Sequence, residues 1–332
     1  GHGTPAEGDR PAGLELWGSD NRVTPEALAE ILDERRRGMT AFVLGQCHSG
    51  AFADLSWLGA KTEGPVAFPA RCVFAAVPAD REASGCTADL TDASAKSYVS
   101  QFARALATPD ADFDRDQKVS LAEAHAFARI HDPTINVPIS STEIWLELAV
   151  GTTPPDAQSV DLRKLLKTAN PAEAAVLAAL GPQYVALADG ARVAERDYAA
   201  SQQKLEQEQK RFEGLQNEFE NARRKLMDGL LAQWPELTNP YHPVSRALLA
   251  GPAPMIVEWL QKQDGLRQLE RLDDALGKLD TTLLAAEKKA ARQERWFRAL
   301  QIVANAAWLR QNRRSTKELE ALRACEALIP HP

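Results

Sequence analysis

The sequence predicts an α/β domain over residues 1–150, followed by an all-α domain over residues 161–332. In the first part, short apolar runs alternate with amphipathic helical segments, a pattern typical of a parallel sheet covered by helices. In the second part, nearly every segment has helical periodicity and many charges. Between them, the segment 151–160 contains two consecutive prolines, which cannot continue a helix, so we interpret it as a linker.

Three apolar runs in the first domain are predicted to be strands. They are "LELW" at 14–17, "TAFVLGQ" at 40–46 and "RCVFAAV" at 71–77. The second run is almost unbroken in its apolar character, which is typical of a strand covered on both faces. We therefore expect helices on each side of the sheet.

Two helices are predicted between and after these strands, over residues 24–37 and 92–107. Thr24 is a suitable N-cap for the first helix, and Pro25 fits its first position because proline lacks the amide hydrogen that this position leaves unused. Asp92 is the expected cap of the second helix.

The second domain contains two heptad patterns, over residues 198–226 and 269–307. Such patterns are typical of coiled coils. Five prolines between residues 233 and 254 exclude one continuous helix. The sequence therefore predicts an antiparallel coiled-coil hairpin, which either packs within the chain or serves as an arm for a protein partner or for self-association.

Composition excludes several classes of function. The net charge is −7 and the pI is about 5.5, so no broad basic surface is available for nucleic acid. No apolar stretch reaches the roughly 20 residues of a membrane-spanning helix. Four cysteines in a chain of 332 residues do not suggest a disulfide framework. Because the chain does not begin with Met, we expect a missing N-terminal part that would contain any targeting segment, and no compartment is predicted.

Cys47 directly follows the apolar run at 40–46, and loops at the carboxyl ends of parallel strands are where functional groups gather. Ser49 and Gly50 lie two and three positions after Cys47, and such small residues let backbone N–H groups approach a substrate carbonyl. His2 lies between two glycines, 45 residues before Cys47. The alternative interpretation is that Cys47 is a buried structural cysteine. His48 is adjacent in sequence, so its side chain is expected to point away from Cys47.

These residues resemble a known family. "GHGT" at 1–4 and "FVLGQCHSGAF" at 42–52 are similar to the histidine and cysteine motifs of caspase-like cysteine peptidases, and the pattern is closest to that of the legumain-like members. The resemblance covers the first domain only. It implies a caspase-like parallel sheet, with His2 as general acid and base and Cys47 as the nucleophile that forms a thioacyl intermediate. The backbone N–H groups of Gly3 and Cys47 would form the oxyanion hole. The implied function is a cysteine endopeptidase acting on proteins or peptides without a cofactor.

Two departures from the family pattern bear on the substrate pocket. Gly45 stands where caspases have Gln and legumains have Glu. Asp80, Arg81 and Ser84 follow the strand at 71–77, where the family lines its specificity pocket, but they carry both signs of charge and predict no preference. The strand that carries the histidine would precede Gly1. We therefore expect the strand at 40–46 at, or next to, an exposed sheet edge.

The same residues allow two other interpretations. A non-catalytic caspase-like scaffold, whose coiled-coil arm recruits a protein partner, would carry the same motifs. A glutamine amidotransferase would need a G-x-C-x-G elbow and a downstream H-x-E motif, and neither occurs in the sequence. The scaffold is therefore the main alternative to the peptidase.

A separate motif, "DFDRDQKVSLAE" at 112–123, resembles a calcium-binding loop between two helices. Its ligands would be the carboxylates of Asp112, Asp114, Asp116 and Glu123 and the carbonyl of Lys118. Gln117 occupies the position where the sharp turn favours glycine, so it must adopt a left-handed backbone conformation. The alternative interpretation is a solvated turn that keeps the helix–loop–helix shape.

Overall fold

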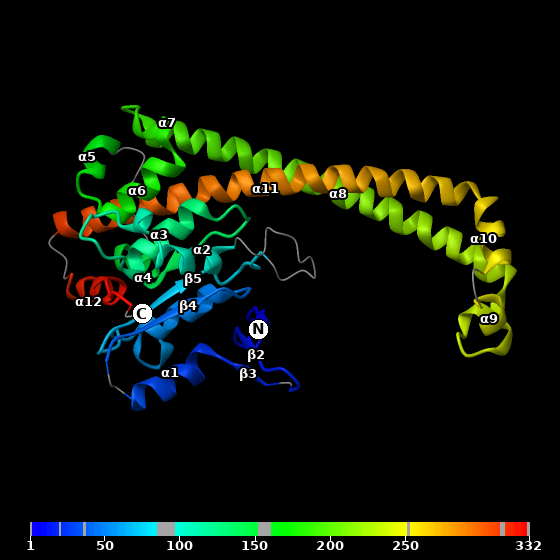
Figure 1. Cartoon of the computed structure of the whole chain (residues 1–332), viewed down its shortest axis with the longest axis horizontal. Helices are drawn as coiled ribbons and strands as arrows, with labels where there is room; N and C mark the ends of the chain where they lie inside the picture. The colour runs from blue at the N-terminus through cyan, green and yellow to red at the C-terminus, as the bar shows by residue number, and fades with distance from the viewer. Residues whose placement is uncertain are drawn as a thin grey trace. The chain divides into compact units, whose positions relative to one another are not determined.

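A computed structural model describes residues 2–19, 21–35, 38–84, 97–151, 161–250, 253–312 and 316–330 (Figure 1). The chain forms two compact units. Unit 1 comprises residues 1–199 together with 288–332, and unit 2 comprises residues 200–287. Unit 1 combines small sheets with helices and unit 2 is helical, so the predicted α/β class with a long helical region is confirmed. No helix in these described ranges is both long enough and apolar enough to cross a membrane.

The elements that lie wholly in unit 1 are β1 Gly3–Thr4, β2 Gly13–Glu15, β3 Arg22–Val23, α1 Pro25–Glu34, β4 Thr40–Leu44, η1 Ser49–Ser56, η2 Leu58–Ala60, β5 Arg71–Ala75, α2 Tyr98–Ala105, η4 Pro109–Ala111, α3 Leu121–His131, β6 Ile139–Ser140, α4 Ser141–Val150, α5 Leu162–Leu166, α6 Pro171–Leu180, α7 Pro182–Val185 and α12 Lys317–Glu326. The remaining elements are α8 Gly190–Gln233, η5 Pro235–Thr238, α9 Pro243–Leu248, α10 Pro254–Gln261 and α11 Asp264–Gln311.

The main sheet has the strand order β4-β5-β6. Strand β4 pairs with β5 in parallel, and β6 pairs with β5 in the antiparallel sense. Among the described residues β4 has only this one neighbour, so the expected edge position of this strand is confirmed. The N-terminal strands β1, β2 and β3 form a separate antiparallel sheet. The sheet that carries Cys47 at the end of β4 is thus mixed rather than purely parallel.

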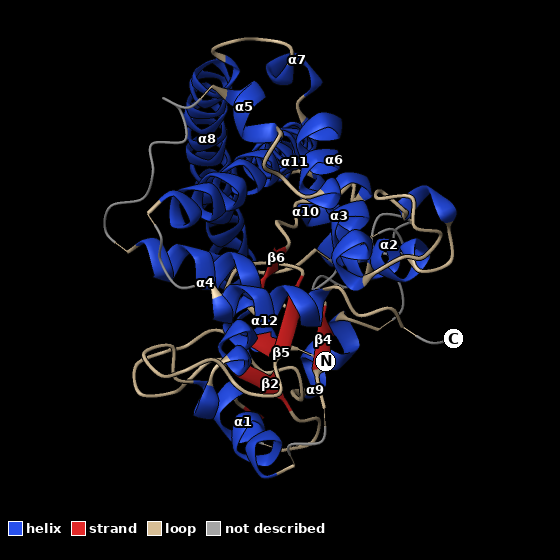
Figure 2. Cartoon of the chain, turned by 90° about the vertical axis from the view of Figure 1, so that its left-hand side faces the viewer, coloured by secondary structure: helices blue, strands red, loops and turns tan. Residues whose placement is uncertain are grey.

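Both faces of the main sheet are covered, as the apolar run predicted (Figure 2). Val73 of β5 packs on one face against α1 and η1, in a cluster with Ala29, Phe52 and Leu55. The neighbouring Phe74 packs on the opposite face against α2 and α3. This alternation follows from the two-residue period of a strand.

The predicted start of the first helix is confirmed. Thr24 accepts a hydrogen bond from the Ala27 amide at 3.2 Å through its side chain, and Pro25 opens α1. The second helix, α2, begins at Tyr98 with Ser97 as its N-cap. The expected cap Asp92 lies outside the described residues, as does most of the predicted linker at 151–160.

The compact units follow a different division from the predicted one. Residues 161–199 and 288–332 belong to unit 1, because α5, α6 and the last part of α11 share a core with α3. Helix α12 returns to the main sheet, where Cys325 forms a disulfide with Cys72 of β5 across 253 residues of sequence. The cysteine count did not suggest a disulfide framework, yet Cys47, Cys72 and Cys325 are all disulfide-bonded. The spacing gave no sign of this pairing because the two cysteines are 253 residues apart in sequence. Both are fully buried in the folded chain.

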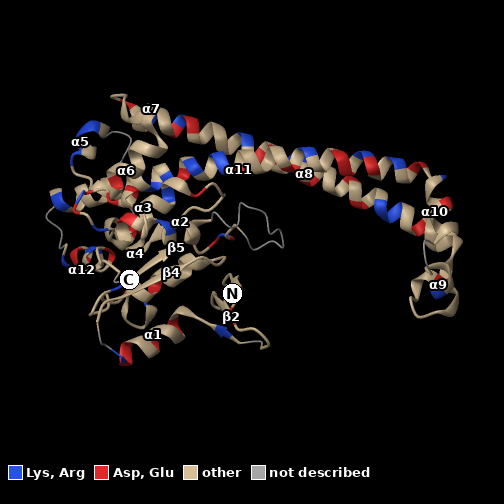
Figure 3. Ribbon diagram, viewed as in Figure 1, with Lys and Arg blue, Asp and Glu red and all other residues tan. Residues whose placement is uncertain are grey.

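The two heptad patterns lie on α8 and α11, and the proline-rich segment between them is broken into η5, α9 and α10 as expected. In unit 2 the heptad positions are less exposed than the positions beside them, and Ala222 and Leu279 are buried. The helices are in contact there, because Gly265 lies against Leu226. Acidic and basic residues are interspersed along both helices (Figure 3).

The last four turns of α11 are buried on more than one side, unlike the part of the helix that lies in unit 2. Leu300 and Ala304 pack into one core cluster, whereas Ile302 and Ala306 pack into another. A helix that is apolar on several sides is typical of a buried core helix rather than of a two-helix seam. This burial explains why residues 288–311 belong to unit 1.

Candidate functional site

Cys47 lies in the loop that follows β4, at the carboxyl end of the strand, as the sequence predicted. Its side chain is 5 % exposed, and it is disulfide-bonded in this structure. The backbone amide of Ala83 donates a hydrogen bond to Cys47 Sγ at 3.2 Å. The sulfur is therefore held against the loop after β5 and is not a free thiol in this state.

The N-terminal segment is in direct contact with Cys47. A Cβ atom on Gly3 would lie 1.8 Å from the Cys47 carbonyl oxygen, so only glycine permits this approach. Strand β1 is held there by β2, and the Glu15 amide also donates to the His2 carbonyl at 2.9 Å. His2 itself is exposed. The structure thus brings the His-Gly pair and the cysteine loop together, although 45 residues separate them in sequence.

The residues after Cys47 bind the loop that follows β5. The His48 amide donates to the Arg81 carbonyl at 2.7 Å, and His48 Nδ1 lies 2.9 Å from the Ala79 carbonyl oxygen. Ser49 bonds to the backbone of Val77. A Cβ on Gly50 would lie 2.6 Å from the Ala79 amide nitrogen. These contacts account for the small and polar residues in the cysteine motif by packing alone.

The candidate substrate-binding residues have different surroundings. Beside Gly45, the space for a side chain is filled by Val99, whose Cγ2 would lie 2.3 Å from an added Cβ. Arg81 forms an ion pair with Glu294 of α11 at 2.8 Å, and the Ser84 amide donates to Asn136. Asp80 is exposed. Arg81 and Ser84 are thus engaged in contacts within unit 1.

A cavity of about 470 Å³ adjoins this loop, next to Gly50 and Pro78. Its wall includes the carboxyl groups of Glu26, Asp54 and Glu147. Burial raises the pKa of Asp54 to about 6, and the charges of Glu26 and Glu63 add to the increase. Arg298 also lines this cavity, so its wall carries acidic residues together with a basic one that is paired with Glu147.

The predicted calcium loop brings three of its carboxylates together. Oxygen atoms of Asp112, Asp114 and Asp116 lie within 4.8 Å of one another. Gln117 adopts the left-handed conformation that the motif requires, with φ of 70°. The loop amides are folded around the carboxylates, since the Gln117 amide donates to Asp112 at 2.9 Å. This donor set suits a hard cation such as Ca²⁺.

Glu123, the fourth expected carboxylate ligand, has a structural role in this conformation. It completes a capping box with Ser120 at the start of α3, and its other oxygen accepts hydrogen bonds from the amides of Phe113 and Asp114. The Asp116 amide lowers the pKa of Asp114, but desolvation and the charges of the neighbouring carboxylates outweigh it and raise the pKa. A bound cation would relieve this repulsion.

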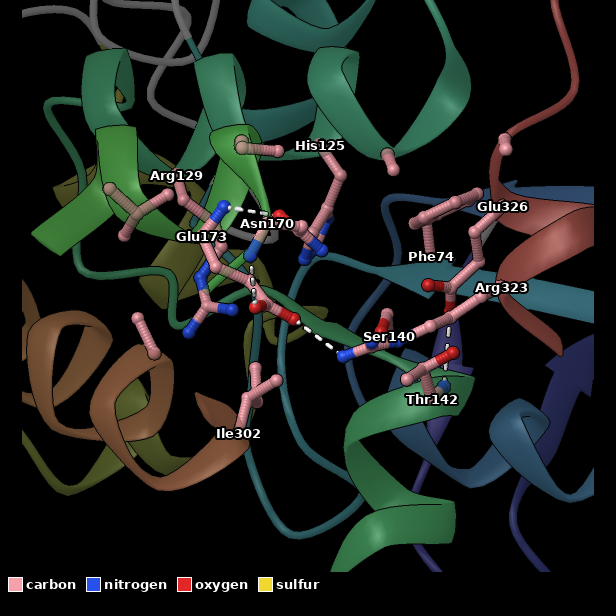
Figure 4. Close-up of a pocket in the computed structure, with 16 residues that line it drawn as sticks. Phe74, His125, Arg129, Ser140, Thr142, Asn170, Glu173, Ile302, Arg323 and Glu326 are labelled. Carbon is pink, nitrogen blue, oxygen red and sulfur yellow. Dashed lines mark hydrogen bonds and ion pairs between the residues drawn. The ribbon is translucent and has the colours of Figure 1, made fainter. Parts of the chain in front are cut away.

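Sequence reasoning did not single out a second polar group within unit 1. His125 and Arg129 of α3, and Arg323 and Glu326 of α12, surround a cavity on the Phe74 side of the main sheet (Figure 4). The signal was present in "LAEAHAFARIH", where His125 and Arg129 are four residues apart in an otherwise mostly apolar helix.

Comparisons with known proteins identify no relative: no family model, no curated protein and no solved structure matches the chain.

Proposed function

We propose that this protein is a cysteine endopeptidase, with reduced Cys47 as the nucleophile and His2 as the general acid and base. The main support is the contact between Gly3 and the Cys47 carbonyl, because it places the residue next to His2 against the cysteine loop. The resemblance of both motifs to those of caspase-like peptidases supports the same assignment. The helical arm is proposed to be an antiparallel coiled-coil hairpin appended to this domain.

The reaction would follow the usual course of thiol catalysis. His2 accepts the Cys47 thiol proton, and the thiolate sulfur attacks the carbonyl carbon of the scissile bond. The backbone N–H groups of Gly3 and Cys47 would stabilise the oxyanion. The imidazolium then protonates the leaving amine, which gives a thioester. A water molecule, deprotonated by His2, hydrolyses the thioester to a carboxylic acid and restores the thiol.

This chemistry requires a reduced Cys47, whereas the sulfur is disulfide-bonded in the structure. A dithiol reductant such as dithiothreitol would supply two electrons and two protons to that disulfide and become a cyclic disulfide itself. Two thiols result on the protein, one of them on Cys47. We therefore propose that the oxidised chain is a latent form of the peptidase.

The test is labelling by a peptidyl acyloxymethyl ketone before and after reduction, followed by peptide mapping. Reduced protein should be labelled at Cys47, and His2→Ala should slow this labelling by about 100-fold or more, as expected for loss of a general base. His48→Asn is the matched control, because asparagine tolerates the positive φ of 58° found at His48. A reduced Cys47 that reacts no faster than reduced Cys325 would contradict the proposal.

A second candidate function is a non-catalytic scaffold that binds a protein partner or associates with itself through unit 2. The burial and disulfide bonding of Cys47 favour it, as do exposed apolar side chains in unit 2. Tyr241, Leu249 and Met255 are 81 %, 53 % and 60 % exposed. Sedimentation velocity of the full chain should then show association that Tyr241→Ser and Met255→Ser reduce. A monomer at all concentrations would argue against self-association.

A further inference from the structure

The polar cavity on the Phe74 side of the main sheet has a volume of about 250 Å³. Its walls come from β5, β6, α3, α4, α6, α11 and α12 (Figure 4). Phe74, Val176 and Ile302 provide apolar surface, and His125, Arg129 and Glu326 provide polar groups. Pockets that hold drug-sized molecules have volumes of about 300–1,000 Å³. This cavity is therefore sized for a smaller molecule.

His125 offers a hydrogen-bond donor to this cavity. The residue is 7 % exposed, and Nδ1 lies 2.7 Å from the Tyr98 hydroxyl. Tyr98 is fully buried, and among the described residues His125 is the hydrogen-bond partner of its hydroxyl. We assign the hydroxyl as the donor, because a buried O–H needs an acceptor. Burial and the charge of Arg129 lower the pKa of His125, so the neutral ring carries its proton on Nε2.

Within the described residues, three buried nitrogen atoms of cavity-lining residues have no hydrogen-bond partner: His125 Nε2, Arg129 Nε and Arg323 Nε. Arg129 is 3 % exposed and uses its other nitrogens, one on Glu143 at 3.4 Å and one on the Arg295 carbonyl at 3.1 Å. A buried donor without an acceptor costs about 1–3 kcal/mol. Two of these donors, His125 Nε2 and Arg129 Nε, belong to residues four apart on α3, and together they call for an acceptor in the cavity.

The carboxyl and guanidinium groups around the cavity favour a ligand that both accepts and donates hydrogen bonds. Arg129 is paired with Glu143, and Arg323 is paired with Glu173 at 3.0 Å. Glu326 forms no such ion pair with a described residue; its carboxylate accepts the Thr142 amide at 3.1 Å. Burial raises its pKa, and hydrogen bonds from Thr142 and Ser140 offset part of the increase. An amide N–H would find an acceptor in the Glu326 carboxyl, whereas an ionised carboxylate ligand has no hydrogen to donate to it.

We propose that this cavity binds a small neutral carbonyl compound, of the primary-amide class, with a short branched apolar body. The carbonyl oxygen accepts hydrogen bonds from His125 Nε2 and Arg129 Nε, and the amide N–H faces Glu326. The apolar body packs against Phe74 and Ile302. This site does not depend on Cys47 or on the proposed peptidase activity.

The test compares three probes that share one apolar body: 3-methylbutanamide, 3-methylbutanoate and 3-methylbutanol. Binding to the full oxidised chain is measured by protein-observed NMR titration. The amide should bind at least tenfold more tightly than the acid or the alcohol, because the ionised acid has no N–H for Glu326 and the alcohol has no carbonyl oxygen for His125 and Arg129. Equal binding of all three would overturn the assignment. Failure of the amide to bind at millimolar concentrations would also overturn it and indicate a water-filled cavity.

Variants that fill the cavity locate the binding. Ala299→Leu places a larger side chain in the cavity from α11, and Ala122→Leu does so from α3 at a less buried position. Either should reduce amide binding at least tenfold. Ala306→Leu is the matched control, since Ala306 is equally buried on α11 but does not line the cavity. Undiminished amide binding to a folded Ala122→Leu protein would refute the location.

Discussion

Removing the disulfide between Cys72 and Cys325 should strongly destabilise unit 1. The bond closes a loop over 253 residues and ties α12 to β5. The loop-entropy relation gives about 5 kcal/mol for a closure of this length, near the top of the range measured for native disulfides. Both sulfurs are fully buried, so Cys72→Ala together with Cys325→Ala also removes packed atoms. For a domain of 150–250 residues, about 5 kcal/mol corresponds to a decrease in Tm of roughly 10–20 °C.

The assay is thermal and urea denaturation of the double variant and the parent under non-reducing conditions. The disulfide of Cys47 remains in both proteins, so the comparison isolates one bond. Alkylation of the unfolded parent, followed by peptide mapping, should leave Cys47, Cys72 and Cys325 unmodified. A double variant with the Tm of the parent would refute the reasoning, as would a parent whose Cys72 and Cys325 are both alkylated without reduction.

Three further predictions concern unit 1. Asp54→Asn should increase the free energy of unfolding at pH 7.5 by roughly 1–2 kcal/mol, a value discounted because the carboxyl is partly exposed, and should therefore raise the Tm. The folded pKa is raised from 3.8 to about 6, so the gain should shrink as pH falls from 7 to 4, and a pH-independent difference would contradict it. Millimolar calcium should raise the Tm relative to chelator; Gln117→Gly should strengthen and Glu123→Gln weaken this shift, and no shift would exclude the metal site. Gly3→Ala should destabilise by roughly 1–3 kcal/mol, since its Cβ would meet the Cys47 carbonyl; an unchanged Tm would disprove that contact.

The sequence was most informative at residues whose chemical type is compatible with few local conformations. Thr24 and Pro25 predicted the start of α1 because a side-chain cap and a proline are compatible at that point. The apolar run at 40–46 predicted a strand covered on both faces, and Cys47 at its end followed from the change to small polar residues. The left-handed conformation of Gln117 followed from its place in the loop motif.

The sequence was least informative about contacts between distant segments. The heptad pattern continues through residues 288–307, but only the tertiary structure shows that this part of α11 is buried on several sides. Cys325 lies in a short helix with no signal for its position over β5. His125 and Glu326 line one cavity although they are 201 positions apart by their residue numbers, and no local pattern joins them.

The two candidate functions differ in what they require of His2. Ser49, Gly50 and Gly3 all have packing roles at the cysteine loop, so their presence is expected of a peptidase and of a scaffold alike. The imidazole of His2 is different, because it is exposed and has no hydrogen-bond or ion-pair partner among the described residues. A scaffold should therefore tolerate His2→Ala with unchanged stability and unchanged reactivity of reduced Cys47. A peptidase should also keep its stability, yet lose the thiolate-dependent reaction, because no imidazole would then accept the Cys47 proton.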